Sequence, residues 1–153
     1  MDNVIVESNE LSKEQIRGRI MDLESAMLSN PDQLIHIEPK HYFVPGLYAR
    51  EIMIPAGVTL TGMIHKTEHL CVLSKGKVSV YTDEGMKTIE ASTVVHSMPG
   101  MKRVLFAHED SVWINFHHNP TNEQNLEKIE EIYTVKTFEE LNNVELIKIG
   151  EVS

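Results

Sequence analysis

Residues 55–76 read PAGVTLTGMIHKTEHLCVLSKG. Two short apolar runs, Val58–His65 and His69–Leu73, lie on either side of a Lys66-Thr67 turn. Runs of this length, bounded by Pro-Gly and Lys-Gly punctuation, are typical of β-strands joined by tight turns. The stretch therefore predicts two neighbouring strands, with one histidine at the end of the first strand and another at the start of the second.

The alternation of side chains along a strand indicates where these two histidines point. Apolar residues accompany each histidine on its own strand face, which predicts that both imidazoles lie on the inner wall of a barrel. Two convergent imidazoles are half of a site for zinc, iron, manganese or nickel. The alternative is a pair of polar side chains at a barrel mouth, satisfied by water or by each other. The two predicted faces are Thr61, Met63, His65 and His69, Cys71, Leu73.

The pattern of short runs continues on both sides of this stretch. Eight short runs at near-regular spacing predict a mainly β fold, a single barrel or sandwich, and exclude a helical bundle. An α/β fold would need helices between the strands. The runs are Leu47–Ile54, Val58–His65, His69–Leu73, Lys77–Tyr81, Met86–Ile89, Thr93–His96, Arg103–Ala107 and Val112–His117.

Helical patterns precede and follow the strands. Ser12 and Gln15 have the spacing of a capping box, and the apolar stripe that starts at Ile16 predicts a helix over 11–30. A second, shorter helix is expected around Leu126–Tyr133. The predicted organisation is an N-terminal helical extension over 1–41, a β-barrel over 42–118, and a tail over 119–153 that packs on the barrel or on a partner subunit.

Composition narrows the setting. The 153 residues are 41% hydrophobic, which fits one folded domain, and the formal net charge of -9 argues against a nucleic-acid binder. The single cysteine, Cys71, precludes an intramolecular disulfide and fits a reducing compartment. With neither a signal-peptide pattern nor a membrane-length apolar run, the sequence predicts a cytoplasmic protein without a membrane partner.

The same stretch resembles the first motif of the cupin superfamily, whose members fold as RmlC-like jelly-roll barrels. That motif runs from a Gly through His-x-His and a Glu to a final Gly. His65 matches the second His, Met63 stands in place of the first, and His69 stands in place of the Glu. The turn at Pro99-Gly100 resembles the second motif and brings Arg103 to the place of the last metal-binding His.

This mapping alters what the resemblance implies about metal. Of the four usual ligands, His65 alone matches in kind, and His69 is a ligand-competent replacement. Arginine cannot ligate a cation, but its planar fork holds a carboxylate or phosphate. The resemblance therefore predicts a jelly-roll pocket around His65, His69 and Arg103 without a complete metal site, with a small polar or anionic molecule as its ligand.

A narrower resemblance is to small cupin proteins encoded by tailed bacteriophages. It is carried by Ser97–Arg103, Ala107–Asp110 and Asn119–Glu123, and it extends through Leu126–Glu130. It implies the cytoplasm of an infected bacterium as the setting and implies nothing about chemistry.

Further residues complete the predicted ligand pocket. Glu68 lies between the two histidines, and Trp113 shares a strand face with Asn115 and His117. Either this face points inward, so that His117 offers a third donor, or Val112, Ile114 and Phe116 fill the core and His117 lies outside. The sequence leaves both open. The predicted ligand-binding set is His65, Glu68, His69, Arg103, Trp113 and His117, with His65 and His69 as metal ligands.

Four functions compete on these residues. The first is a small-molecule-binding cupin, and the second is a metal-dependent dioxygenase or isomerase that uses His65, His69 and a third donor. The third is a metal-free sugar-nucleotide isomerase or epimerase with His65 beside Glu68. The fourth is a structural protein. A homodimer is expected in each case, because sheet edges and the apolar stripe of the first helix need cover.

Overall fold

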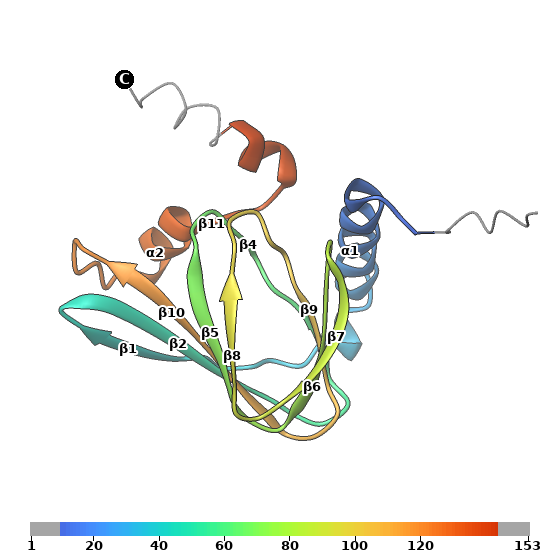
Figure 1. Ribbon diagram of the computed structural model, residues 1–153, viewed down its shortest axis with the longest axis horizontal. Coiled ribbons are helices and arrows are strands. Elements are labelled where there is room, and N and C mark those ends of the chain that lie inside the picture. The colour runs from blue at the N-terminus through green and yellow to red at the C-terminus, as the bar shows by residue number, and fades with distance from the viewer. Residues whose placement is uncertain (1–9, 144–153) are drawn as a thin grey trace, which may run out of the picture.

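The barrel is formed by two antiparallel sheets that face each other (Figure 1). The computed structural model describes residues 10–143. The larger sheet has the strand order β1-β2-β10-β5-β8, and the smaller has β3-β9-β6-β7. The longer strands are β1 (Lys40–Val44), β2 (Gly46–Ile54), β5 (His69–Lys75), β6 (Lys77–Thr82), β7 (Gly85–Glu90), β8 (Thr93–Ser97) and β10 (Ser111–Asn119); the shorter ones are β3 (Thr59–Thr61), β4 (Ile64–His65), β9 (Val104–Ala107) and β11 (Thr134–Val135).

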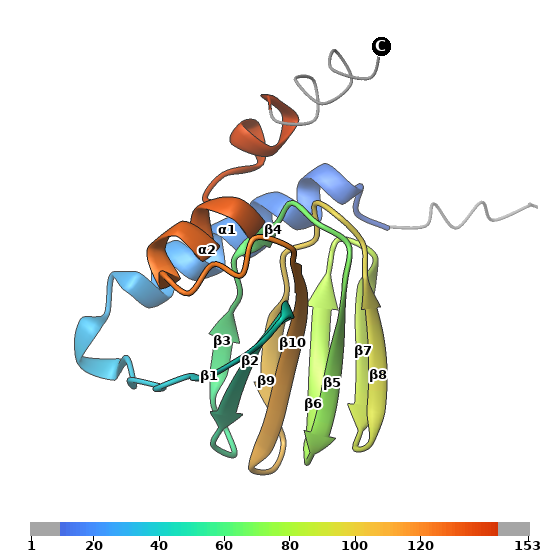
Figure 2. The ribbon, with the colours of Figure 1, turned by 90° about the vertical axis from the view of Figure 1, so that its left-hand side faces the viewer.

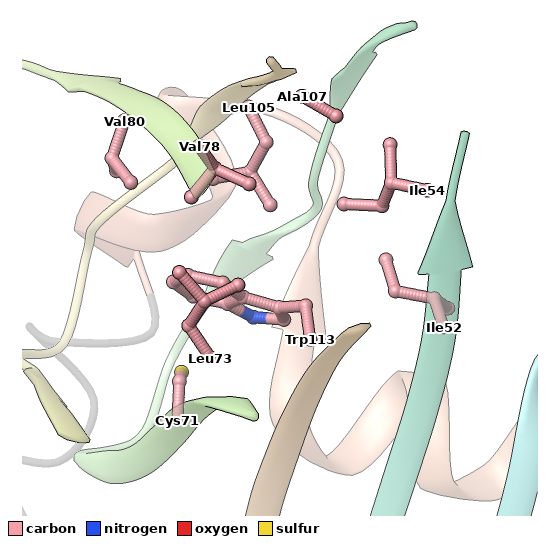
Figure 3. Packing of buried hydrophobic residues seen from close by; sticks show 9 residues of the cluster. All are labelled: Ile52, Ile54, Cys71, Leu73, Val78, Val80, Leu105, Ala107 and Trp113. Atoms are coloured by element: carbon pink, nitrogen blue, oxygen red, sulfur yellow. The ribbon is translucent and has the colours of Figure 1, made fainter. Parts of the chain in front are cut away.

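The core forms from apolar side chains on the inner faces of β2, β5, β6, β9 and β10. β10 alternates between buried and partly or fully exposed positions, and Trp113 on its inner face is only 2% exposed. Figure 3 shows this indole among side chains that come from both sheets. This apolar cluster fills one end of the barrel interior, and polar residues occupy the other end. Its members are Ile52, Ile54, Cys71, Leu73, Val78, Val80, Leu105, Ala107 and Trp113.

The N-terminal helix α1 (Lys13–Leu28) lies beside the barrel (Figure 1). The predicted capping box is confirmed, since Ser12 and Gln15 exchange hydrogen bonds at its start. Of the predicted apolar stripe, Ile20 is buried, whereas Leu23 is 39% exposed. An ion pair of 2.7 Å between Glu24 and the buried Lys102 fastens the helix to the loop before β9.

The C-terminal tail closes one end of the barrel. Helix α2 (Leu126–Tyr133) begins at Asn125, whose side chain accepts a hydrogen bond from the Lys128 backbone N–H. β11 follows directly and pairs with β4, so this segment crosses the end of the barrel at which β5 begins (Figure 2). The buried residues of α2, Ile129 and Tyr133, contact Tyr48. Helix α2 and β11 therefore complete the packing at this end of the barrel.

The predicted mainly β barrel with helices at both ends is confirmed, and the differences are local. The single strand expected over Val58–His65 is divided into β3 and β4 at Gly62-Met63, where the chain turns toward the end of the barrel. β1 was not predicted as a strand, and it begins at Lys40, just before the expected start of the barrel at residue 42. Nothing within residues 10–143 forms a helix long and apolar enough to cross a membrane.

Gly76 provides a test of the barrel's packing. It has φ +89°, and a Cβ at this position would lie 2.2 Å from Ser111 Oγ and 2.6 Å from the Asp110 carbonyl oxygen. We expect Gly76→Ala to lower the free energy of unfolding by about 2–3 kcal/mol, measured by urea unfolding. Gly57→Ala is the matched control, because Gly57 has φ +83° with open space around it. An equal loss in both variants would show that the backbone alone sets the effect.

Candidate metal centre and ligand cavity

Three histidine rings meet at the closed end of the barrel. His65, His69 and His117 have one ring nitrogen each within 4.8 Å of the others. The ring centroids are 4.5 Å apart for His65–His69, 4.6 Å for His69–His117 and 5.5 Å for His65–His117. The predicted pair is thus part of a group of three.

Strand geometry brings these rings together. His65 ends β4 and His69 begins β5, so the turn between them places both at the same end of the barrel. His117 lies on the inner face of β10, one position beyond the Phe116–Leu70 pair with β5. This resolves the alternative left open by the sequence: the face of Trp113, Asn115 and His117 points inward.

Burial keeps the imidazoles neutral. It lowers the pKa of His65 to about 2 and that of His117 to about 3, with the neighbouring imidazoles adding to both shifts. The pKa of His69 is also lowered, mainly by burial, although the Thr67 carbonyl opposes this. Neutral imidazole is the form that offers a lone pair to a metal.

The orientation of the rings fits a metal centre. His69 Nδ1 lies 3.1 Å from the Thr67 carbonyl oxygen, to which it donates, and this leaves Nε2 as the acceptor nitrogen. His69 Nε2 and His117 Nδ1 are both buried without a hydrogen-bond partner. Buried polar atoms are rarely left unsatisfied, so these two nitrogens are available to hold a metal ion.

Two tyrosines hold His117 in place. The ring of Tyr133, from α2, stacks on the His117 ring at 4.7 Å, and Tyr48 stacks on it at 6.0 Å. The Tyr133 hydroxyl donates to the His118 carbonyl oxygen, and β11 pairs with β4 beside His65. The tail thereby excludes water from one side of the cluster.

Arg103 lies next to the histidines. Its side chain is 5% exposed, and its guanidinium carbon lies 5.7 Å from the centroid of the Trp113 ring. Backbone hydrogen bonds hold the surrounding loop: Gly62 N–H donates to the Arg103 carbonyl at 2.9 Å, and Gly100 N–H donates to the His65 carbonyl at 2.7 Å. The predicted Pro-Gly turn therefore places Arg103 against the histidine strand.

A buried polar network lies below the cluster. Asn115 Oδ1 accepts hydrogen bonds from the Cys71 thiol at 2.9 Å and from Trp113 Nε1 at 3.1 Å. Burial raises the pKa of Cys71 to about 11, so it remains a protonated donor and not a thiolate ligand. These hydrogen bonds hold the Trp113 ring in place beneath the Arg103 guanidinium.

These residues surround a cavity of about 470 Å³. That volume lies within the range of small-molecule sites. Apolar side chains dominate its wall, and Arg50 and Arg103 are its two cationic residues. The residues that carry its chemistry are His41, Tyr48, Arg50, His65, Arg103, Trp113, Asn115, His117 and Tyr133.

Two predicted pocket residues do not line this cavity: His69, which belongs to the adjoining histidine cluster, and Glu68. Glu68 points outward and pairs with His96, and both side chains are more than half exposed, at 57% and 58%. The outward direction follows from the turn, which carries Glu68 away from the face that His69 occupies. A mechanism that places Glu68 beside His65 as an acid–base pair is therefore wrong.

Three further residues of the cavity, Tyr48, Arg50 and Tyr133, were not among the residues predicted from the sequence. Arg50 and Tyr48 lie on the inner face of β2, on which Ile52 and Ile54 follow, so alternation along that strand carried their signal. Tyr133 had no such signal, because its role depends on how the tail folds back over β10.

Comparison with known proteins supports the fold. No family model and no curated protein sequence matches this chain. An RmlC-like cupin from Shewanella frigidimarina is 17% identical, with a TM-score of 0.47 over 57% of this chain and 78% of its own. Salicylate 1,2-dioxygenase from Pseudoaminobacter salicylatoxidans, determined with gentisate, is 14% identical, with a TM-score of 0.50 over 69% of this chain. This chain matches 32% of the dioxygenase's length.

The chain has the cupin jelly-roll fold, with a three-histidine cluster that could hold a metal ion. The fold does not identify a reaction, because one architecture hosts many chemistries. The site residues themselves must support any function.

Proposed function

We propose that the protein is a metal-dependent cupin enzyme in which His65, His69 and His117 hold one divalent transition metal. The convergence of three neutral imidazoles, with two buried nitrogens left without partners, carries this proposal. It revises the expectation of an incomplete metal site, because His117 supplies the third donor. Imidazole sets without a thiolate suit zinc, iron or nickel; manganese prefers oxygen ligands.

The protein residues divide the work around the metal. A bound metal in a three-ligand site supplies Lewis acidity at its remaining positions. The Thr67 carbonyl orients His69, and Tyr133 excludes water beside His117. Arg103 offers a fixed positive charge to a polar or anionic ligand in the adjoining cavity.

Metal content tests the proposal. The protein is purified without a metal-chelating tag, stripped with chelator, and incubated in turn with zinc, iron(II), nickel and manganese. We expect about one equivalent of metal per chain by elemental analysis, and a raised melting temperature, since a ligand that binds only the folded state stabilises it. Less than about a tenth of an equivalent with each metal, and no change in melting temperature, would overturn the proposal.

A metal-free ligand-binding protein is the second candidate. It is favoured by the buried guanidinium of Arg103, which can bind an anion without any metal. Ligand binding that is unchanged in metal-stripped protein would support it over the enzyme. The bacteriophage setting, the host-cytoplasm location and the homodimer expected from the sequence remain predictions, and light scattering would test the last of them.

A further inference from the structure

The guanidinium of Arg103 is a buried cation without an acidic partner. Among residues 10–143 no ion pair includes it, although the residue is only 5% exposed. Its Nε and Nη2 atoms are both buried without hydrogen-bond partners. Leaving a charged donor buried and unpaired costs several kcal/mol unless something else binds it. The position therefore calls for an anion that is not part of this chain.

The two unsatisfied atoms define the shape of that anion. Nε and Nη2 lie on the same edge of the planar guanidinium, and their N–H bonds point in parallel. This edge matches the two oxygens of one carboxylate in a side-on, bidentate arrangement. The face of the same group lies over the Trp113 ring, and the loop around it is fixed by the Gly62 hydrogen bond. Arg103 is therefore held in place, and the edge that carries Nε and Nη2 is buried without a hydrogen-bond partner among residues 10–143.

The rest of the cavity indicates what the carboxylate is attached to. Ile52, Leu60, Leu105 and the Trp113 ring line the wall beside Arg103. Glu130 is the one carboxylate in the lining, and it is exposed at the rim on α2. An apolar wall of this kind favours a hydrocarbon or aromatic body over a sugar or a nucleotide.

The positive charge within the cavity favours the binding of an anion there, although the protein as a whole is acidic. The chain has a formal net charge of -9, yet Arg50 and Arg103 are the two charged groups that act on His65 from within the cavity. Opposite charge within a concave site raises the local concentration of an anion and its rate of binding. The cationic cavity is thus a local exception to the charge of the whole chain.

We propose that the ligand of this site is a small carboxylic acid with an apolar or aromatic body, whose carboxylate is bound side-on by Nε and Nη2 of Arg103. The proposal rests on the proposed function only in placing the ligand in the cavity beside the histidine cluster. The body lies along Trp113 and Leu105, and the ligand supplies the acidic group that the three histidines and Arg103 lack.

Calorimetric titration of wild-type protein with benzoate, benzamide and inorganic phosphate tests the proposal. Benzamide has the size and shape of benzoate without its charge, and phosphate has charge without an apolar body. Because charge-assisted bidentate pairs are strong, we expect benzoate to bind at least about a hundredfold more tightly than benzamide and about tenfold more tightly than phosphate. Equal binding of benzoate and benzamide, or tighter binding of phosphate, would overturn the proposal.

Substitution of the arginine provides the second arm. Arg103→Lys keeps the charge but loses the fork, and we expect benzoate to bind about tenfold more weakly, with a larger loss in Arg103→Gln. Arg19→Gln, on the exposed face of α1, is the control and keeps wild-type affinity. Unchanged affinity in Arg103→Lys and Arg103→Gln would place the carboxylate elsewhere and overturn the proposal. Should either variant fail to fold, the comparison of three ligands on wild-type protein still decides.

The same titrations are made on metal-stripped and zinc-loaded protein, which separates the two proposals. Arg103-dependent binding of benzoate in a chain that takes up no metal would uphold the carboxylate site and overturn the metal enzyme. Stoichiometric metal uptake without selective binding of benzoate would do the reverse.

Discussion

Replacing His117 with alanine is expected to abolish stoichiometric metal binding. His117 is one of three converging donors, and its Nδ1 has no other partner, so its removal leaves two imidazoles for a metal that needs at least three protein ligands to remain bound. Loss of an outer-shell residue alone weakens metal affinity by about 10–100-fold, so loss of a direct ligand should exceed that range. Competition titration with a chromogenic chelator, on zinc-loaded protein, measures the change.

The surface histidine His108 supplies the matched control. His108 Nε2 is hydrogen-bonded to the Ser79 hydroxyl on the outside of the smaller sheet, and neither residue belongs to the three-histidine cluster. His108→Ala should retain wild-type zinc affinity and stoichiometry. Equal affinity in wild type, His117→Ala and His108→Ala would show that any bound zinc lies outside the three-histidine cluster.

The alternation of residues along strands was sufficient to predict much of this site. The inward faces of Cys71 and Leu73 on β5 follow directly from a period of two, whereas the sequence left the face of Trp113 on β10 open. The convergence of His65 and His69 followed from a short turn between adjacent strands. These features depend on neighbours in sequence, which is why the sequence carried them.

The features that were missed depend on contacts between distant segments. Tyr133 reaches His117 because α2 folds back over β10, and β11 pairs with β4 across about 70 residues of chain. Glu68 faces outward because the turn carries it away from the face of His69, and there it pairs with His96 on the neighbouring strand β8. Neither contact can be predicted from the periodicity of the sequence.

The departures from the cupin metal motifs become understandable in three dimensions. Met63 lines the cavity as part of its apolar wall and leaves a ligand position without a donor. His117, from outside both motifs, restores a third nitrogen. Arg103 places a positive charge at the position where the cupin motif that the sequence resembles has its last histidine, and this charge can anchor an anion. Met63, Arg103 and His117 all line the same cavity, which supports testing them together.

Acidification is expected to lower the free energy of unfolding of the metal-free protein strongly, at pH values higher than those at which carboxylates titrate. In the unfolded chain the histidines have a pKa near 6.5, whereas burial holds His65 at about 2 and His117 at about 3 in the fold. A lowered pKa in the folded state means that protons bind the unfolded chain first, so stability is complete above about pH 6.5 and is lost as the pH falls. Between about pH 7.5 and 5.0 each histidine contributes about 2 kcal/mol of loss, and the two together about 4 kcal/mol.

Urea unfolding of metal-stripped protein at these two pH values measures the loss, and substitution assigns it. In His117→Gln one titrating group is absent, so the pH-dependent loss should fall by about 2 kcal/mol, whatever the variant's stability at neutral pH. His108→Gln, on the surface, should keep the wild-type difference. Because Glu24 titrates with a pKa lowered from 4.5, its contribution falls below this window. A wild-type loss of less than about 1 kcal/mol would mean that the histidines become protonated within the fold, and that the cluster is more open to water than its burial indicates.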